Sequence, residues 1–178
     1  WTAAVTDLAA KIAGARRTWL APDGSGKAAI ETPRRAMGNL LGHAVRFGRA
    51  DDILAAGEGI ETMLSLRLVL PHMPMAAALS ANHLAALLLP PTLRRLYVAR
   101  DADAAGDMAL AALAERAAAA GVEVLPLSPR QGDFNDDLKA FGPDAIRADL
   151  RPQLAPDDAA TISRRRNPGF GLRQRNAS

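Results

Sequence analysis

The sequence predicts an α/β domain in which helices flank a parallel sheet of about four strands. Two observations support this fold class. Between residues 51 and 150, an apolar segment, a loop and a helix-like segment follow one another four times, which is typical of a parallel sheet wrapped by helices. Acidic loops also follow several of these strands, and open α/β sheets bind ligands beyond the carboxyl ends of their strands.

The segments between residues 51 and 150 have recognisable boundaries. Pro71 ends the first helix, Ser80 is suited to cap the second, and Gly121 is suited to end the third. Short apolar runs predict strands at residues 52–56, 75–79, 96–99 and 122–127. Helices are expected at residues 60–70, 81–89 and 107–120, with two short ones at 133–139 and 143–150.

Residues 1–50 predict a small, basic, β-rich N-terminal subdomain. The spacing of its first apolar residues predicts a short helix within residues 1–13. Strands at 15–20 and 27–32, joined by a turn at 22–26, form the expected hairpin, and residues 43–47 alternate like a third strand.

The C-terminal segment differs in composition from residues 1–50 and from residues 51–150. Residues 151–178 are polar, include the run Arg164-Arg165-Arg166 and show no apolar periodicity. Such a segment cannot bury enough apolar surface to offset the entropy of ordering, so a disordered basic tail is predicted.

Charge is unevenly distributed along the chain. Residues 51–150 hold 14 acidic and 8 basic side chains, a net charge of −6, between flanks of +5 (residues 1–50) and +4 (residues 151–178). Clustered carboxylates repel one another unless a cation lies among them, and basic flanks attract polyanions. The pattern favours a nucleic-acid partner, although an Ala- and Arg-rich composition also produces such a split by chance.

Composition excludes several classes of protein. The chain has no cysteine, which excludes disulfides and Cys-based zinc sites within it and fits a reducing, cytoplasmic setting. No apolar run approaches the roughly 20 residues of a membrane span, so no membrane partner is expected. Because the chain begins with Trp1 rather than Met, we expect a fragment of a longer protein.

An Asp-x-Asp pair follows the third predicted strand. On an extended segment, Asp101 and Asp103 point to the same face. Two close carboxylates raise each other's pKa unless a cation neutralises them, and Mg²⁺ and Mn²⁺ prefer oxygen ligands. Gly106 then allows a tight turn into the next helix. The alternative is structural, because acidic residues are favoured at a helix N-terminus.

Glu58 follows the first predicted strand, between Gly57 and Gly59. The glycines permit a sharp turn and close approach of the backbone to a phosphate. A carboxylate here can hold a metal or act as a general acid/base, or it is simply solvated in a strand–helix turn. Glu61 lies in the first turn of the next helix, so a structural or supporting role is expected for it.

A third acidic cluster follows the fourth predicted strand. Asp133 can cap the next helix or contribute to the site. Asp136 and Asp137 point in different directions on a helix, so at most one of them is expected to reach the site, and Asn135 could orient a ligand or water.

Together these motifs resemble the Toprim family, which includes bacterial primases, type IA and type II topoisomerases, some nucleases and some recombination proteins. The resemblance covers about residues 51–140. Glu58 before a glycine matches the family's glutamate, and Asp101 and Asp103 match its Asp-x-Asp metal pair. Asp133 with Asn135 and Asp136 resembles the Asp-x-Asn-Asp segment of many plasmid and phage primases.

The sequence departs from the chromosomal-primase form of the motif. An aromatic residue and an aspartate follow the Glu-Gly pair there, whereas Ile60 and Thr62 occupy those positions here. Plasmid-type relatives tolerate this difference. Residues 1–50 also resemble the segment that precedes the Toprim domain in plasmid primases.

The resemblance implies a Rossmann-like Toprim fold and metal-dependent chemistry. Mg²⁺ or Mn²⁺ is expected on Asp101, Asp103, Asp133 and Asp136, where it would bind phosphates. Glu58 is expected to act as general acid/base or as a further metal ligand.

The basic N-terminal segment is expected to contact nucleic acid. Trp19 either packs the hairpin or stacks on a base. The expected contacts come from Arg16, Arg17, Lys27, Arg34 and Arg35.

The implied function is RNA primer synthesis by a plasmid- or phage-type primase. Its partners would be a single-stranded DNA template and nucleoside triphosphates. A zinc-binding region and a helicase would lie elsewhere in the parent protein.

Other functions stay open at this point. A Toprim nuclease needs the same carboxylates, and a non-catalytic nucleic-acid-binding module with Toprim ancestry needs none of them. A topoisomerase needs a nucleophilic tyrosine, and the only one, Tyr97, lies within a predicted strand. A response-regulator-like domain needs a lysine at a later strand end, and Lys139 is the only lysine after Lys27.

Overall fold

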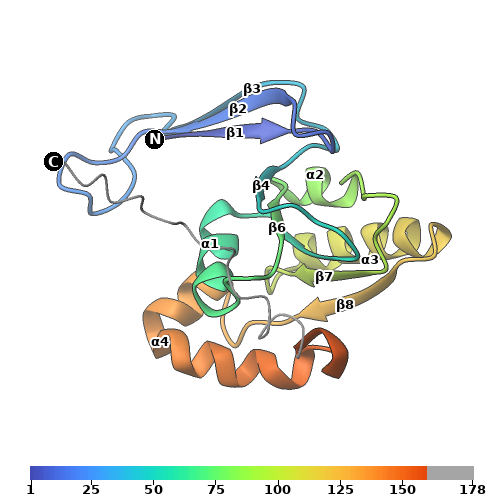
Figure 1. Ribbon diagram of the computed structural model, residues 1–178. Helices are drawn as coiled ribbons and strands as arrows, with labels where there is room; N and C mark the ends of the chain where they lie inside the picture. The colour runs from blue at the N-terminus through green and yellow to red at the C-terminus, as the bar shows by residue number, and fades with distance from the viewer. Residues whose placement is uncertain (160–178) are drawn as a thin grey trace, which may run out of the picture.

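A five-stranded sheet forms the centre of the computed structural model, which describes residues 1–159. Its order is β4-β6-β5-β7-β8, and Figure 1 shows helices on both of its sides. The parallel part confirms the four predicted strands, and β4 adds an antiparallel edge. The strands are β4 (Val45–Phe47), β5 (Ile53–Gly57), β6 (Met75–Ala77), β7 (Arg95–Ala99) and β8 (Glu123–Leu127).

Four helices cover the two faces of this sheet. Side chains alternate along β5, so Ile53 and Ala55 face one core while Leu54 and Ala56 face the other. The first core holds α1 (Ile60–Val69) and α4 (Phe134–Leu150), and the second holds α2 (Ala81–Ala85) and α3 (Ala104–Ala119). Burial on both faces explains why the central strands β5 and β6 are apolar throughout rather than alternating.

Helix α4 is interrupted where the sequence predicted a gap between two short helices. Gly142 has φ 77° inside α4, and Pro143 follows it. Glycine adopts this left-handed conformation without steric cost, and proline is suited to begin the second helical part.

A separate antiparallel sheet forms the N-terminal subdomain. It has the order β1-β2-β3, with β1 (Thr2–Thr6), β2 (Ile12–Thr18) and β3 (Arg34–Gly38), and lies beside β4 (Figure 1). The predicted helix at residues 1–13 is wrong, because Ala3 and Val5 alternate into the core as a strand requires. Asp7 closes the β1–β2 turn by accepting hydrogen bonds from the amides of Ala9 and Lys11.

The remaining predicted strands of this region have mixed outcomes. The strand at 15–20 is confirmed as part of β2. The strand predicted at 27–32 is wrong, because this segment makes only an isolated bridge from Lys27 to Leu20 and pairing resumes at β3. The strand at 43–47 is confirmed as β4, but it pairs with β6 in the central sheet.

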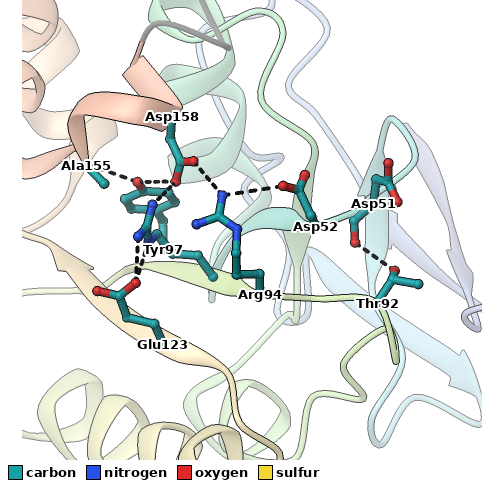
Figure 2. Close-up of polar contacts among 9 residues, drawn as sticks. Asp51, Asp52, Thr92, Arg94, Tyr97, Glu123, Ala155 and Asp158 are labelled. Carbon is teal, nitrogen blue, oxygen red and sulfur yellow. Dashed lines mark hydrogen bonds and ion pairs between the residues drawn. The ribbon is translucent and has the colours of Figure 1, made fainter.

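The prediction of a disordered tail from residue 151 is wrong for residues 151–159. Residues 151–153 form the 3-10 helix η1 (Arg151–Gln153), and a helical turn follows. Asp158 is 2% exposed and accepts hydrogen bonds from Tyr97, Arg94 and Arg95 (Figure 2). These buried bonds order the segment in spite of its polar sequence. The rest of the predicted tail, residues 160–178, lies outside the described residues.

Candidate active site

The three acidic loops leave the same edge of the central sheet. Strands β5, β7 and β8 are neighbours, and Gly57, Ala99 and Leu127 align in register at their carboxyl ends. Glu58 therefore follows one strand where Asp101 follows the next. The shared sheet edge explains how residues far apart in the sequence meet.

Glu58 sits in a crowded turn. A Cβ on Gly57 would lie 2.7 Å from Met63 Sδ and 3.0 Å from the Ala99 carbonyl oxygen, so the strand end packs tightly. Glu58 Oε1 is buried and has no hydrogen-bond partner. Burial raises the pKa of Glu58, and the nearby charges of Asp101 and Asp103 raise it further.

Asp101 has a similar environment. Its Oδ1 is buried without a hydrogen-bond partner. Burial raises the pKa of Asp101 to about 6, with further contributions from the charges of Asp133, Asp103 and Asp136. The carboxylates therefore lie close enough to repel one another.

Glycine shapes the Asp101 loop. A Cβ on Gly106 would lie only 2.3 Å from the Asp101 carbonyl oxygen, so the start of α3 could not pack here with any larger residue. The amide of Ala102 donates to the carbonyl oxygen of Gly132 at 2.8 Å, which ties this loop to the loop before Asp133.

Asp103 and Asp133 both cap helices, as the structural alternatives proposed. Asp103 Oδ1 accepts from the amide of Gly106 at 2.8 Å, so α3 starts earlier than predicted. Asp133 Oδ1 accepts from the amides of Asn135 and Asp136, while its Oδ2 accepts from Thr62 Oγ1 at 3.2 Å. Capping fixes the direction of both carboxylates.

Asp136 is exposed, although its charge still acts on Asp101. Its side chain is 51% exposed and stands 3.8 Å from Lys139 Nζ. Asp137 is buried and accepts from the amides of Arg130 and Gln131, so it stabilises the preceding loop.

The carboxylates fit a hard divalent cation by their chemistry. Within residues 1–159, no three His, Asp or Glu side chains are grouped as a ready-made metal site. Glu58 and Asp101 nevertheless each hold an unpaired buried oxygen, and oxygen is the donor that Mg²⁺ and Mn²⁺ prefer. These two carboxylates, with Asp103 and Asp133 beside them, could hold such an ion.

A cationic wall faces the carboxylates. Glu58, Asp101 and Asp133 line a cavity of about 750 Å³ together with Lys27 and Arg34 from the N-terminal segment. Arg16 and Arg34 line a smaller adjoining pocket with Glu58. The cavity thus presents negative and positive groups to the same space, as phosphate bound with a metal requires.

The five predicted nucleic-acid-binding residues do not form one group. In the register of β2 and β3, Arg17 lies opposite Arg35, whereas Arg34 lies opposite Thr18. Neighbouring residues of a strand point to opposite faces, so Arg17 and Arg35 lie on the face away from Arg16 and Arg34. The guanidinium of Arg17 stands 5.6 Å from the centre of the Trp19 ring, so Trp19 packs within the subdomain.

Two residues of the site carried no clear signal in the sequence. Thr62 contacts Asp133 across 71 positions, which only the packing of α1 beside α4 brings about. Glu61, expected to be structural or supporting, lines the cavity and forms an ion pair with Arg34, at 2.5 Å between Oε1 and Nη2. The periodicity of a helix in the sequence cannot show that Thr62 contacts Asp133 or that Glu61 contacts Arg34.

Comparison with known families agrees with this arrangement. A model of the Toprim domain matches residues 53–144, and a domain of unknown function (DUF7146) matches residues 2–47. A search of curated proteins finds no matching sequence. The two matched regions correspond to the central α/β domain and to the N-terminal subdomain with β4.

Solved structures of primases share the fold at low sequence identity. A bacteriophage T7 primase-helicase fragment has TM-score 0.57 and 15% identity over 85% of this chain and 61% of its own. A Pseudomonas aeruginosa DNA primase domain has TM-score 0.56 and 18% identity over 89% and 52%. The Aquifex aeolicus primase has TM-score 0.55 and 19% identity over 85% and 39%.

This chain spans about two fifths to three fifths of the length of those three structures, and the likeness concerns their fold. The family match rests on separate ground, because it covers more than half of this sequence and contains all three acidic loops. The chain belongs to the Toprim domain family.

Proposed function

We propose that this chain is the catalytic part of a primase-type enzyme, which joins ribonucleotides on a single-stranded DNA template. One observation carries the proposal. Unpartnered buried oxygens of Glu58 and Asp101 line the same cavity as Lys27 and Arg34. This arrangement fits a nucleoside triphosphate whose phosphates lie between cationic side chains and a carboxylate-bound metal ion.

The metal ligands in this proposal are the capping and buried carboxylates. Asp101 and Asp103 would hold Mg²⁺ or Mn²⁺, with Asp133 beside them and the more exposed Asp136 at the margin. When bound, the ion would neutralise charge on the phosphate oxygens during transfer. The hydrogen bond from Thr62 would keep Asp133 turned toward the site.

Glu58 has the environment of a proton acceptor. Its raised pKa brings proton exchange closer to neutral pH, and its free Oε1 is available to a substrate hydroxyl. In the proposed reaction, the 3′ hydroxyl gives its proton to Glu58 while its oxygen bonds to the α-phosphorus. Pyrophosphate then leaves with the electrons of the broken bond.

Basic side chains would position the nucleic acid and nucleotide. Lys27 and Arg34 line the cavity, and Arg16 adjoins it, so they would contact phosphates near the reaction. Arg17 and Arg35 lie on the opposite sheet face and would contact nucleic acid outside the cavity. The solved relatives include a zinc-binding region and a primase-helicase protein, and we propose such parts elsewhere in the parent protein.

Primer synthesis tests this proposal directly. Purified chain is given template, ribonucleotides and Mn²⁺, and Glu58→Gln is compared with the parent. We expect the variant to slow synthesis by about 100-fold or more, the usual contribution of a general acid/base. Glu115→Gln, an exposed glutamate on α3, is the matched control and should retain full activity. Equal synthesis by Glu58→Gln and the parent would overturn the assignment.

The same protein preparation can be used to distinguish a primase from a nuclease. Metal-dependent cleavage of a labelled strand without nucleotides would identify a nuclease instead. The topoisomerase alternative lacks a nucleophile within the chain, because the only tyrosine, Tyr97, is fully buried and its hydroxyl donates to Asp158.

A further inference from the structure

One carboxylate and one guanidinium from different parts of the fold pair with each other in the lining of the cavity. Arg34 lies on β3 of the N-terminal sheet, and Glu61 lies in the first turn of α1. Their ion pair, 2.5 Å long, joins the two walls of a cavity that both residues line with Glu58 and Asp101.

Glu61 supplies a negative charge to the basic side chains that line this region. Glu61 forms an ion pair with Arg34, and its negative charge also stabilises the protonated form of nearby Arg16. Both side chains of the pair are substantially exposed, 37% for Arg34 and 48% for Glu61. Exposed ion pairs add little to stability, so this one can be exchanged for another at small cost.

We infer that Glu61 is an internal substitute for phosphate, which holds Arg34 in the cavity lining until the polyphosphate of a nucleotide replaces it. A polyphosphate carries several negative charges against one on Glu61, and the arginine fork matches phosphate oxygens in paired hydrogen bonds. Glu61 is thus a positioning residue that acts through Arg34, and it lowers polyphosphate affinity by competition. The inference rests on the proposed function only for the nature of the ligand.

Binding of inorganic tripolyphosphate tests the exchange without catalysis. Titration calorimetry at fixed low salt and fixed Mg²⁺ compares the parent with Glu61→Gln. Loss of an exposed competitor should tighten binding by roughly two- to fivefold. Glu115→Gln removes the same charge from the distant exposed face of α3 and should leave the affinity unchanged.

A double-mutant cycle identifies the route of the effect. Arg34→Ala should weaken tripolyphosphate binding, and Glu61→Gln added to it should give no further gain, because the competed cation is absent. An equal gain in both backgrounds would show a general charge effect and overturn the inference. Glu61→Ala provides a second variant, since the half-exposed side chain leaves no buried cavity when truncated.

The outcomes separate this inference from the proposed function. If Glu61→Gln binds tripolyphosphate no better than the parent, or if neither protein binds it, the exchange is wrong. Primer synthesis that depends on Glu58 would still support the function in that case. Conversely, tighter binding with no primer synthesis by the parent would support a polyphosphate site that serves another reaction.

Discussion

At the scale of single residues, the candidate site is marked by buried carboxylate oxygens that have no hydrogen-bond partner. Most buried polar atoms in proteins have a hydrogen-bond partner, so Glu58 Oε1 and Asp101 Oδ1 require an explanation. Their raised pKa values show that both are disfavoured as free carboxylates. A bound cation would contact the unpaired oxygens and also neutralise the repulsion between the carboxylates. The same residues are therefore suited to metal binding.

Neutralising Asp101 should stabilise the metal-free protein. The pKa of Asp101 is raised to about 6, so its contribution favours folding below its unfolded pKa and is lost as pH rises through 6. Asp101→Asn should therefore raise the free energy of unfolding at pH 7 by about 1–2 kcal/mol, allowing for solvent screening. Urea unfolding in chelator measures this change.

The pH series provides the internal check for Asp101→Asn. Near pH 3 the parent carries a neutral carboxyl at this position, so the difference from the variant should vanish. Asp144→Asn, at a 94% exposed position, should change stability little at either pH. If Asp101→Asn destabilises the chelated protein at pH 7, the repulsion described here does not operate.

At the scale of elements, two of the proposed metal ligands are also helix caps. Asp103 caps α3 and Asp133 caps α4, so each carboxylate is held by the helix that it caps. This explains why structural and functional interpretations of these acids were both supported by the sequence. The loop geometry between Asp101 and Asp103 depends in turn on Gly106, where a side chain has no room.

Gly106→Ala should damage the loop although alanine favours helices. The added Cβ would lie 2.3 Å from the Asp101 carbonyl oxygen, so α3 or the loop must shift. We expect a loss of about 1–3 kcal/mol in the free energy of unfolding, the usual cost of forced overpacking. Mn²⁺ affinity should fall as well, because Asp101 moves.

Gly26→Ala is the matched control for this change. Gly26 has nothing within 4 Å of an added Cβ, so the substitution should be neutral or slightly stabilising. Urea unfolding of both variants, with Mn²⁺ titration of each, makes the comparison. Unchanged stability and metal affinity in Gly106→Ala would contradict the packing argument.

At the scale of the whole molecule, charged side chains repel one another at the carboxyl ends of the central strands but form ion pairs at the amino ends. The carboxyl edge holds carboxylates that repel one another, whereas the amino edge holds paired charges around Asp158 (Figure 2). Burial alone would raise the pKa of Asp158, but hydrogen bonds from Arg95, Tyr97 and Arg94 outweigh it and lower the pKa. The ion pairs around Asp158 stabilise the fold, whereas the repelling carboxylates of the candidate site destabilise it.

Asp158→Asn should therefore be destabilising in a pH-dependent way. The lowered pKa of Asp158 contributes stability above its unfolded value of about 3.9, and this is lost as pH falls further. We expect the variant to lose about 1.5–3 kcal/mol at pH 7, because three hydrogen bonds to the Asp158 carboxylate are weakened while Arg95 keeps its ion pair with Glu123. Urea unfolding at pH 7 and pH 3 should show the difference shrinking, and an equal difference at both would contradict it.

The sequence predicted the central domain well because its signals are local. Apolar strands, Pro71 and Gly121 mark their own boundaries, and parallel topology follows from the repeated helices. The N-terminal sheet was harder, since the spacing of Val5 and Leu8 suits a helix as well as a strand. Partners such as Arg34 and Glu61 depend on tertiary packing and leave no local signal.

The exposed edge of β3 has a practical consequence for studying this protein. Within residues 1–159, Arg35 to Gly38 pair with β2 on one side only and are exposed, so β3 offers unpaired backbone groups to another chain. Charged side chains on such edges discourage intermolecular pairing and aggregation. Alanine variants of Arg34 and Arg35 therefore remove this protection as well as the proposed nucleic-acid contacts. Lysine replacements, which retain the charge, would separate poor solubility from loss of nucleic-acid contact.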